Sequence, residues 1–318
     1  MLIFNKIIGV LLFLFCAHAW ASQIPFEVPH VYEFTYEVTI EPAQKENQPL
    51  SLWVPYPVED ESQKILSFKS LSSWPQKVTQ EKKYGNRMLY LQGKTKKKTQ
   101  TLTFQYKIKR FPDRGIKSNK NFLDPALYKG PDQWVPIFPE IKTLAKEQTK
   151  KASNTHEKIR ALYDYTVQIM TYDKSGKGWG NGDAVWACST KRGNCTDFHS
   201  LFIALNRSEN IPGRFEIGFP MPVDQKEGEI LGYHCWASAY DHQKGWIPVD
   251  ATEAKKTGKI EKYFGALPSN RIQFSQGRDI VLSPKQKGKP LNYFIYPYAE
   301  VSGKTYTGIT KKFYFKKL

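Results

Sequence analysis

The sequence predicts an α+β fold, in which an antiparallel β-sandwich precedes a domain where a cysteine-bearing helix packs on an antiparallel sheet. Short segments that alternate apolar and polar residues run through residues 31–110, a pattern typical of half-buried strands. Apolar residues then recur at helical spacing after residues 153 and 195. Alternating segments return after residue 213, so strands lie on both sides of the helices in the sequence.

The first 21 residues have the pattern of a secretory signal peptide. Lys6 precedes an apolar run over residues 7–15, and residues 19–21 read Ala-Trp-Ala, with small residues at the cleavage positions. The apolar run is too short to span a bilayer. We therefore expect cleavage after Ala21 and a periplasmic or secreted protein.

The 318 residues are 40% hydrophobic and 14% aromatic, which suffices for a packed core and excludes a disordered chain. The formal net charge of +17 would favour nucleic acid as the partner of an intracellular protein, but export argues against that partner. The lysines are scattered apart from a cluster at residues 94–98, the tip of an expected hairpin. The charge indicates either a solvated basic surface or attraction to an anionic envelope surface.

Breaks in these patterns divide the mature chain into three parts. Residues 22–112 form the predicted β-sandwich domain, in which no residues have catalytic spacing. Residues 113–152 are rich in proline and form a connector. Residues 153–318 form the second domain, and we assign the strand-like segments after residue 280 to it as a C-terminal β extension.

Each helix of the second domain has a recognisable start. Ser153 or Asn154 can cap the first helix, and a short helix is expected over residues 183–188. Asn194 can cap the next helix, with Asp197 as its capping-box partner. The expected strands of this domain lie at residues 214–219, 233–240 and 246–250.

Cys195 occupies the first turn of the helix that Asn194 caps. A helix N-terminus carries partial positive charge and unbonded N–H groups, which favour a thiolate and can bind an oxyanion. Cysteine is also among the most buried residue types, so Cys195 alone would favour core packing. A nucleophile needs, in addition, a base and a group that orients the base.

His234 and Asp250 can supply the missing groups. They lie in two expected strands joined by a turn at residues 241–245, which would bring both side chains to the same end of an antiparallel pair. Asp250 would fix the imidazole tautomer while His234 accepts the thiol proton. His199, one turn along the cysteine helix, is a competing base that we interpret as structural.

The remaining cysteines suggest no metal site, because no CxxC or HxxxH spacing is present, and we expect no metal or cofactor. Successive strand residues face opposite sides, so Cys235 should face away from a site that contains His234. On that far side, a disulfide between Cys188 and Cys235 and two separate buried thiols both stay open.

A glycine-dense loop over residues 174–183 precedes the cysteine helix. It lacks the Gly-Lys-Ser/Thr ending of a phosphate-binding loop. The loop is either a pocket wall, in which Trp179 covers the substrate, or an exposed turn.

Three motifs, RGNC (residues 192–195), GYHCWASAY (232–240) and GWIPVDATEA (245–254), resemble the transglutaminase-like (transglutaminase core) superfamily. The likeness is to exported bacterial members with an N-terminal β-domain. The family's nucleophile, base and orienting acid fall on Cys195, His234 and Asp250. The resemblance implies a papain-like catalytic core and acyl chemistry through a thioester.

We therefore predict a cysteine-dependent acyl-transfer enzyme for peptide or carboxamide bonds, with hydrolysis favoured over transamidation because water is always present. Its substrates would be peptides, proteins or cell-wall amides, and it would act as a monomer. Trp179 and Trp236 are the candidate substrate-binding residues. The alternative is a non-catalytic envelope-binding module on the same scaffold, with a groove lined by Trp179, Trp236 and Tyr240.

Overall fold

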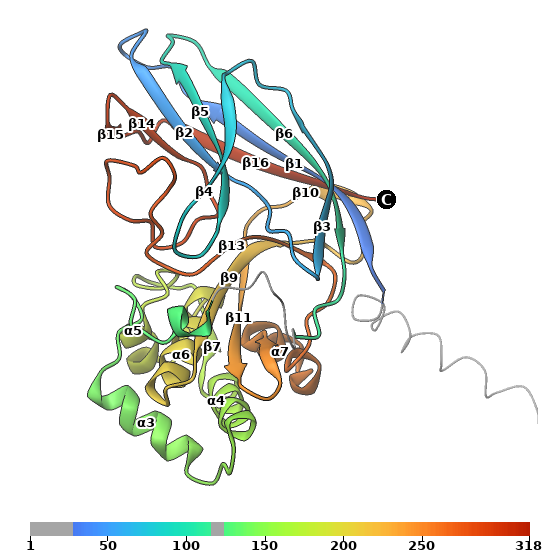
Figure 1. Ribbon diagram of the computed structural model, residues 1–318, viewed down its shortest axis with the longest axis vertical. Coiled ribbons are helices and arrows are strands. Elements are labelled where there is room, and N and C mark those ends of the chain that lie inside the picture. The colour runs from blue at the N-terminus through green and yellow to red at the C-terminus, as the bar shows by residue number, and fades with distance from the viewer. Residues whose placement is uncertain (1–27, 116–123) are drawn as a thin grey trace, which may run out of the picture.

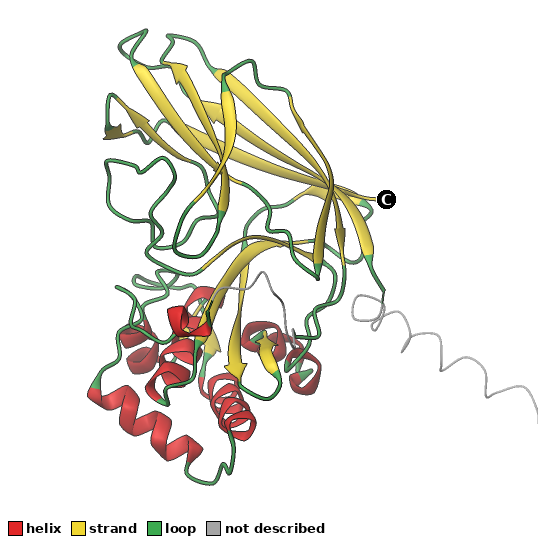
Figure 2. Cartoon of the chain, viewed as in Figure 1, coloured by secondary structure: helices red, strands yellow, loops and turns green. Residues whose placement is uncertain are grey.

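The computed structural model describes residues 28–115 and 124–318, so the expected signal peptide at residues 1–21 lies outside the described residues. A β-sandwich forms one end of the molecule (Figure 1). The helices gather around a smaller sheet at the other end (Figure 2). This mixed architecture, in which almost all strand pairs are antiparallel, confirms the predicted fold class.

Each layer of the sandwich is a five-stranded sheet. In order, the strands of the first sheet are β10 (Glu227–Glu229), β16 (Ile309–Lys317), β1 (His30–Ile40), β6 (Gln100–Arg110) and β3 (Gln63–Ser70). Those of the second are β15 (Lys304–Thr305), β14 (Tyr298–Val301), β2 (Pro49–Pro55), β5 (Arg87–Lys94) and β4 (Gln76–Gln80). The predicted alternation holds in β1, where every second side chain from Tyr32 to Ile40 is buried.

The C-terminal strands belong to the sandwich, which corrects their assignment to the second domain. β16 pairs with β1 from Ile309 opposite Ile40 to Lys317 opposite Tyr32, and β14 pairs with β2. β10, which lies between β9 and β11 in the sequence, pairs with the other edge of β16. The sequence assignment was wrong because alternation identifies a strand and its buried face but does not specify which strand it pairs with.

The Pro-rich connector contains a helix that the sequence did not predict. α3 (Pro139–Thr149) begins with proline, whose missing N–H costs nothing at the first helical position. A one-turn helix, η1 (Pro125–Tyr128), precedes it. Between the two, Asp132 forms a buried ion pair with Arg207 at 2.6 Å, which joins the connector to the second part of the chain.

That second part is built around α6 (Cys195–Ser208), whose residues are almost all buried. α6 lies on a four-stranded sheet in the order β12 (Gly245–Val249), β11 (His234–Asp241), β9 (Gly213–Pro220) and β13 (Arg271–Gln276). Around them lie α4 (Thr155–Ile169), α5 (Ala184–Thr190), α7 (Ala251–Thr257), η2 (Ile260–Tyr263) and the short parallel pair β7 (Thr171–Tyr172) and β8 (Arg192–Gly193). The observed N-cap of α4 is Asn154, one of the two predicted caps. The short helix expected over residues 183–188 is α5, which Asp183 caps and which runs on to Thr190.

The sandwich and the smaller sheet share one aromatic core. Phe219 of β9 lies 5.1 Å from the ring of Phe34 in β1 and 4.3 Å from that of Phe313 in β16. Phe274 of β13 packs 5.1 Å from Phe34. Ring pairs at these separations contribute favourable quadrupole contacts in addition to buried area. The sandwich therefore supports the strands that carry the candidate site.

Candidate active site

The N-terminus of α6 is fixed by a complete capping box. The Asn194 side chain accepts the N–H of Thr196 at 2.9 Å, and Asp197 Oδ2 accepts the N–H of Asn194 at 2.9 Å. Asp197 also accepts the N–H groups of Gly180 at 2.7 Å and Gly182 at 3.0 Å. One buried carboxylate thus holds both the start of α6 and the glycine-dense loop, so Cys195 begins the helix from a rigid frame.

Gly193 is required where the chain enters this frame. Its φ of +141° is a conformation that side-chain-bearing residues rarely adopt. A Cβ at this position would lie 2.3 Å from Asp197 Oδ2. The glycine before the cysteine therefore allows the backbone to approach the capping carboxylate.

The structure brings the three predicted catalytic residues together at one end of the sheet. β11 and β12 form the expected hairpin, with Ala237 opposite Val249. His234 Nε2 lies 2.6 Å from Asp250 Oδ2, and the same imidazole forms a hydrogen bond with the thiol of Cys195. Both residues of the reacting pair are almost enclosed, with Cys195 4% and His234 7% exposed.

Burial and charge shift the pKa values of this group in directions that suit a thiolate–imidazolium pair. Burial alone would raise the pKa of Asp250, but the charges of His234 and Arg271 hold it well below its usual range. Burial opposes a charged His234, yet Asp250 and Cys195 raise its pKa to about 10. Hydrogen bonds with Cys235 and then His234 hold the pKa of the Cys195 thiol well below its ordinary value, against the effect of burial.

His199 lies beside the pair but has both ring nitrogens engaged. Nδ1 lies 2.8 Å from the carbonyl of Cys195, and Nε2 accepts the N–H of Ala251 at 3.1 Å. These contacts define a neutral ring that donates from Nδ1, and burial lowers its pKa. The contacts suit a structural link between α6 and α7.

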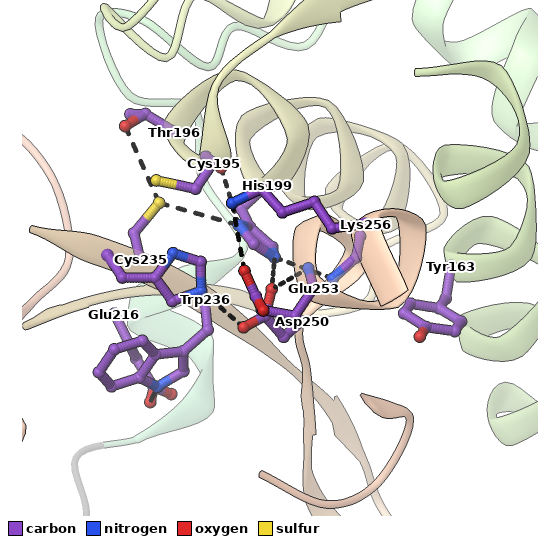
Figure 3. A network of polar contacts seen from close by, with 12 residues as sticks. Tyr163, Cys195, Thr196, His199, Glu216, Cys235, Trp236, Asp250, Glu253 and Lys256 are labelled. Carbon is purple, nitrogen blue, oxygen red and sulfur yellow. Dashed lines mark hydrogen bonds and ion pairs between the residues drawn. The ribbon is translucent and has the colours of Figure 1, made fainter. Parts of the chain in front are cut away.

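Cys235 does not face away from the site, and the predicted orientation was wrong. Its Sγ lies 3.8 Å from Thr196 Oγ1 and 3.8 Å from His199 Nδ1, beside the thiol of Cys195 (Figure 3). Strand alternation does turn Cys235 toward α6 and Trp236 toward the other face. Cys195, at the start of α6, lies beside the first residues of β11. At this end of the strand the side chains of His234 and Cys235 can both contact the Cys195 thiol, although they leave the strand on opposite faces.

This placement also excludes the disulfide between Cys188 and Cys235. All three described cysteines are free thiols. The Cys188 thiol, in α5, has Lys191 Nζ as its neighbour at 3.8 Å. The two thiols are therefore separate, but of the two only Cys235 is buried, whereas Cys188 is half-buried.

Trp236 does not line a groove, which corrects its assignment as a substrate-binding residue. Its side chain is fully buried, and its Nε1 donates to Glu216 Oε2 at 2.6 Å. The Arg271 guanidinium lies 5.3 Å from its ring centroid. Tyr240 packs instead against Trp246, with ring centroids 5.3 Å apart. The groove proposed for a non-catalytic binding module is therefore not formed.

Trp179 lies half-buried on the glycine-dense loop. Its Nε1 donates to the carbonyl of Gly176 at 3.2 Å, and Lys174 Nζ lies 5.8 Å from its ring. The loop is held beside the start of α6, because Asp197 accepts the N–H of Gly180 and Arg278 donates to the carbonyls of Asn181 and Gly182 at 3.0 and 3.2 Å.

The sequence missed Arg271, which contacts the group, and Lys256, which lies near it. Arg271 Nη1 donates to Asp250 Oδ2 at 2.7 Å, and both side chains are buried. An arginine inside the strand-like run RIQF was its only sequence signal. Lys256 of α7 extends toward Cys195 (Figure 3), with Nζ 3.2 Å from Glu253 Oε1 and 4.0 Å from the Tyr172 ring.

Within residues 28–115 and 124–318, no cluster of three or more His, Cys, Asp or Glu side chains could hold a metal ion. The helices of this same described part include none that is long and apolar enough to cross a membrane.

The part of the chain that carries this site is similar to known proteins. Residues 142–251 match the sequence model of the transglutaminase-like superfamily. An uncharacterized protein of Haemophilus influenzae is 29% identical over 327 aligned positions, covering 86% of each chain. The uncharacterized protein YebA of Bacillus subtilis is 26% identical over 172 positions, covering 48% of this chain and 23% of its own.

A solved structure has a similar fold along nearly the whole chain. It is that of a candidate cysteine protease from Cytophaga hutchinsonii, with a TM-score of 0.60, 16% identity and coverage of 90% of this chain and 91% of that one. The residues that match the model of the transglutaminase-like superfamily, 142–251, include Cys195, His234 and Asp250.

Proposed function

We propose that this protein is a cysteine-dependent enzyme that hydrolyses peptide or carboxamide bonds through a thioester. One arrangement carries the proposal: a thiol at the start of a buried helix contacts an imidazole whose Nε2 lies 2.6 Å from a buried carboxylate. That order of nucleophile, base and orienting acid is the requirement for nucleophilic acyl transfer.

In the first step the Cys195 thiolate attacks the substrate carbonyl carbon and the carbonyl π electrons move to oxygen. The backbone N–H at the start of α6 donates to this oxyanion. The C–N bond then breaks, and His234 gives its proton to the leaving amine, so that a thioester remains. Asp250 keeps the imidazole oriented and stabilises its positive charge.

Water completes the proposed reaction. His234, now neutral, accepts a proton as water attacks the thioester, and the acid leaves as Cys195 regains its negative charge. A primary amine at the same position would give transamidation. We favour water because the part of the thiol open to solvent is small, with Cys195 only 4% exposed, and water is the smallest nucleophile available.

Alkylation of Cys195 by iodoacetamide tests the reactive pair without a known substrate. The wild-type thiol should react faster than Cys188 in the same chain, which is an internal control because its thiol lies beside Lys191 and away from His234. His234→Ala should slow only the reaction of Cys195. Equal rates for the two thiols, unchanged by His234→Ala, would refute the proposal.

Turnover is then tested on libraries of peptides, protein side-chain amides and cell-wall amides, with Cys195→Ala as the inactive control. A labelled primary amine added to the reaction separates the two fates of the thioester. Release of acid without incorporation of label supports hydrolysis, and label in the product would show transamidation.

We also propose that the protein is exported, on the basis of the signal-like pattern of residues 1–21. The basic surface would then meet an anionic envelope. N-terminal sequencing of the protein recovered from its cell should begin at residue 22, and an intact Met1 would contradict export by this signal.

A further inference from the structure

A second thiol lies directly beside the candidate nucleophile. Cys235 and Cys195 are hydrogen-bonded through their thiols, and Figure 3 shows the two sulfur atoms side by side. The pair joins different elements, because Cys235 comes from β11 and Cys195 from the first position of α6.

The surroundings of Cys235 hold its sulfur in this position. Its side chain is fully buried, and its other polar neighbours, Thr196 Oγ1 and His199 Nδ1 of α6, both lie 3.8 Å away. A buried thiol with these weak partners adds little to packing that an alanine or valine would not supply. The proposed acyl-transfer steps do not use it either.

The two thiols differ in their tendency to lose a proton, and thiol–disulfide chemistry begins at the one that ionises more readily. Cys195 is the ionised and slightly exposed member, whereas burial raises the pKa of Cys235 and keeps it protonated. Oxidants attack the thiolate first. A thiolate in an oxidising environment is exposed to irreversible conversion to sulfinic acid unless a neighbouring thiol intercepts the first product.

We propose that Cys235 is the resolving thiol of Cys195: a hydroperoxide oxidises the nucleophile, and the pair closes to a reversible Cys195–Cys235 disulfide that protects the site. This inference rests on the proposed function only in requiring a reactive Cys195. It assigns a modification site, with a hydroperoxide as the chemical class of its oxidant.

The proposed disulfide forms in two steps, oxidation of Cys195 and then attack by Cys235. The Cys195 thiolate attacks one peroxide oxygen, the O–O bond breaks, and the alcohol or water leaves after protonation, so sulfur becomes a sulfenic acid by a two-electron oxidation. The sulfur of Cys235 then attacks that of Cys195 and the S–O bond breaks. The departing hydroxide takes the Cys235 proton and leaves as water, and the S–S bond has formed.

Mass spectrometry of the full chain treated with hydrogen peroxide tests this. In the wild type we expect a non-reduced peptide pair linking Cys195 to Cys235, a loss of two hydrogen masses, and recovery of alkylatable Cys195 after dithiothreitol. Cys235→Ala should give no linked pair, a dimedone adduct at Cys195 under mild treatment, and no recovery once sulfinic acid forms. Cys188→Ala, which removes the distant thiol, should behave as wild type.

Two outcomes would overturn the proposal. One is a wild type that accumulates dimedone adducts as Cys235→Ala does, without a linked pair. The other is a linkage that involves Cys188 instead. If Cys235→Ala does not fold, the wild type still decides, because a trivalent arsenical should bridge adjacent thiols and protect Cys195 and Cys235, but not Cys188, from alkylation. These readouts need no substrate, so a protein that forms the disulfide but hydrolyses nothing would contradict only the proposed function.

Discussion

Arg271 Nη1 lies 2.7 Å from Asp250 Oδ2, the same oxygen that lies 2.6 Å from His234 Nε2. The carboxylate is fully buried and its second oxygen accepts the N–H of Glu253 at 3.0 Å. Asp250 therefore contacts His234 and Arg271 and also caps the start of α7. Because it cannot rotate without losing these partners, the imidazole is held in one orientation.

Replacing Arg271 should weaken catalysis without affecting substrate affinity. Arg271→Gln removes a charged partner of Asp250 from a buried position, and we expect kcat to fall about tenfold, equivalent to about 1.4 kcal/mol, with KM unchanged. Arg271→Lys keeps the charge and should recover part of the loss. A purely structural role would instead lower the melting temperature of both variants equally and leave kcat per folded molecule intact.

Thiol reactivity should be nearly independent of pH through the neutral range. The pKa of Cys195 is lowered, so its thiolate is already present, and the pKa of His234 is raised to about 10, so the imidazolium persists up to that pH. Iodoacetamide rates should be flat between about pH 6 and 9, whereas an ordinary thiol with a pKa of about 8.5 gains nearly tenfold per unit below that value.

The rate of hydrolysis should fall at high pH because of the same pair, Cys195 and His234. As the pH rises through about 10, His234 loses the proton that the leaving amine needs, and hydrolysis should fall. A rate that instead rises steadily from pH 6 to 9 would show an unpaired thiol.

Gly193→Ala should destabilise the start of α6. The new Cβ would lie 2.3 Å from Asp197 Oδ2 at a φ of +141°, so the capping carboxylate must move and release its amide partners. We expect the free energy of unfolding to fall by about 3 kcal/mol, measured by urea denaturation. Gly258→Ala is the matched control, because its φ is +69° but no atom lies within 4 Å, and it should cost only about 1 kcal/mol.

Glu216 should be important for folding although it lies outside the reacting group. Its buried carboxylate accepts from Arg214 Nε at 2.7 Å, Trp236 Nε1 at 2.6 Å and Ser238 Oγ at 2.7 Å. Glu216→Ala leaves a buried charge without its ion-pair partner, and we expect a loss of about 3–5 kcal/mol in urea denaturation. Glu229→Ala removes an exposed carboxylate and should have almost no effect, so equal losses would contradict the prediction.

The C-terminal strand should stabilise the catalytic part of the chain from a distance. Phe313 is buried in β16 and lies 4.3 Å from Phe219 in β9, the strand that pairs with β11 at His234. Phe313→Ala should lower the free energy of unfolding by about 3–5 kcal/mol. Lys312→Ala, an exposed neighbour on the same strand, should leave it unchanged. A single cooperative transition that shifts for Phe313→Ala, followed by the fluorescence of the tryptophans, checks this coupling.

Local patterns were sufficient for much of the site. Asn194 and Asp197 have the residue types and spacing of a capping box, and the helix that they start is built from its own sequence. The β11–β12 hairpin was equally local, since its turn and two strands follow one another in the chain. These features placed Cys195, His234 and Asp250 before any tertiary contact was known.

Contacts between distant segments required the tertiary structure. Arg271 reaches Asp250 only because β13 pairs with β9, and β16 completes the sandwich only because its buried face matches that of β1. The alternation of Phe313 and Phe315 defines a buried face but does not identify the partner strand. The glycine-dense loop likewise gave no sign that its amides would be held by Asp197.

The sequence by itself determined the three residues of the candidate site and the elements that carry them, because a helix start and a hairpin are set by neighbours along the chain. The tertiary structure alone decided that Trp236 is buried, that Arg271 joins the acid and that Cys235 lies beside the nucleophile. The physical reason is that strand alternation assigns each side chain of β11 to one face of the sheet. At the end of β11, beside the start of α6, side chains from both faces can contact Cys195.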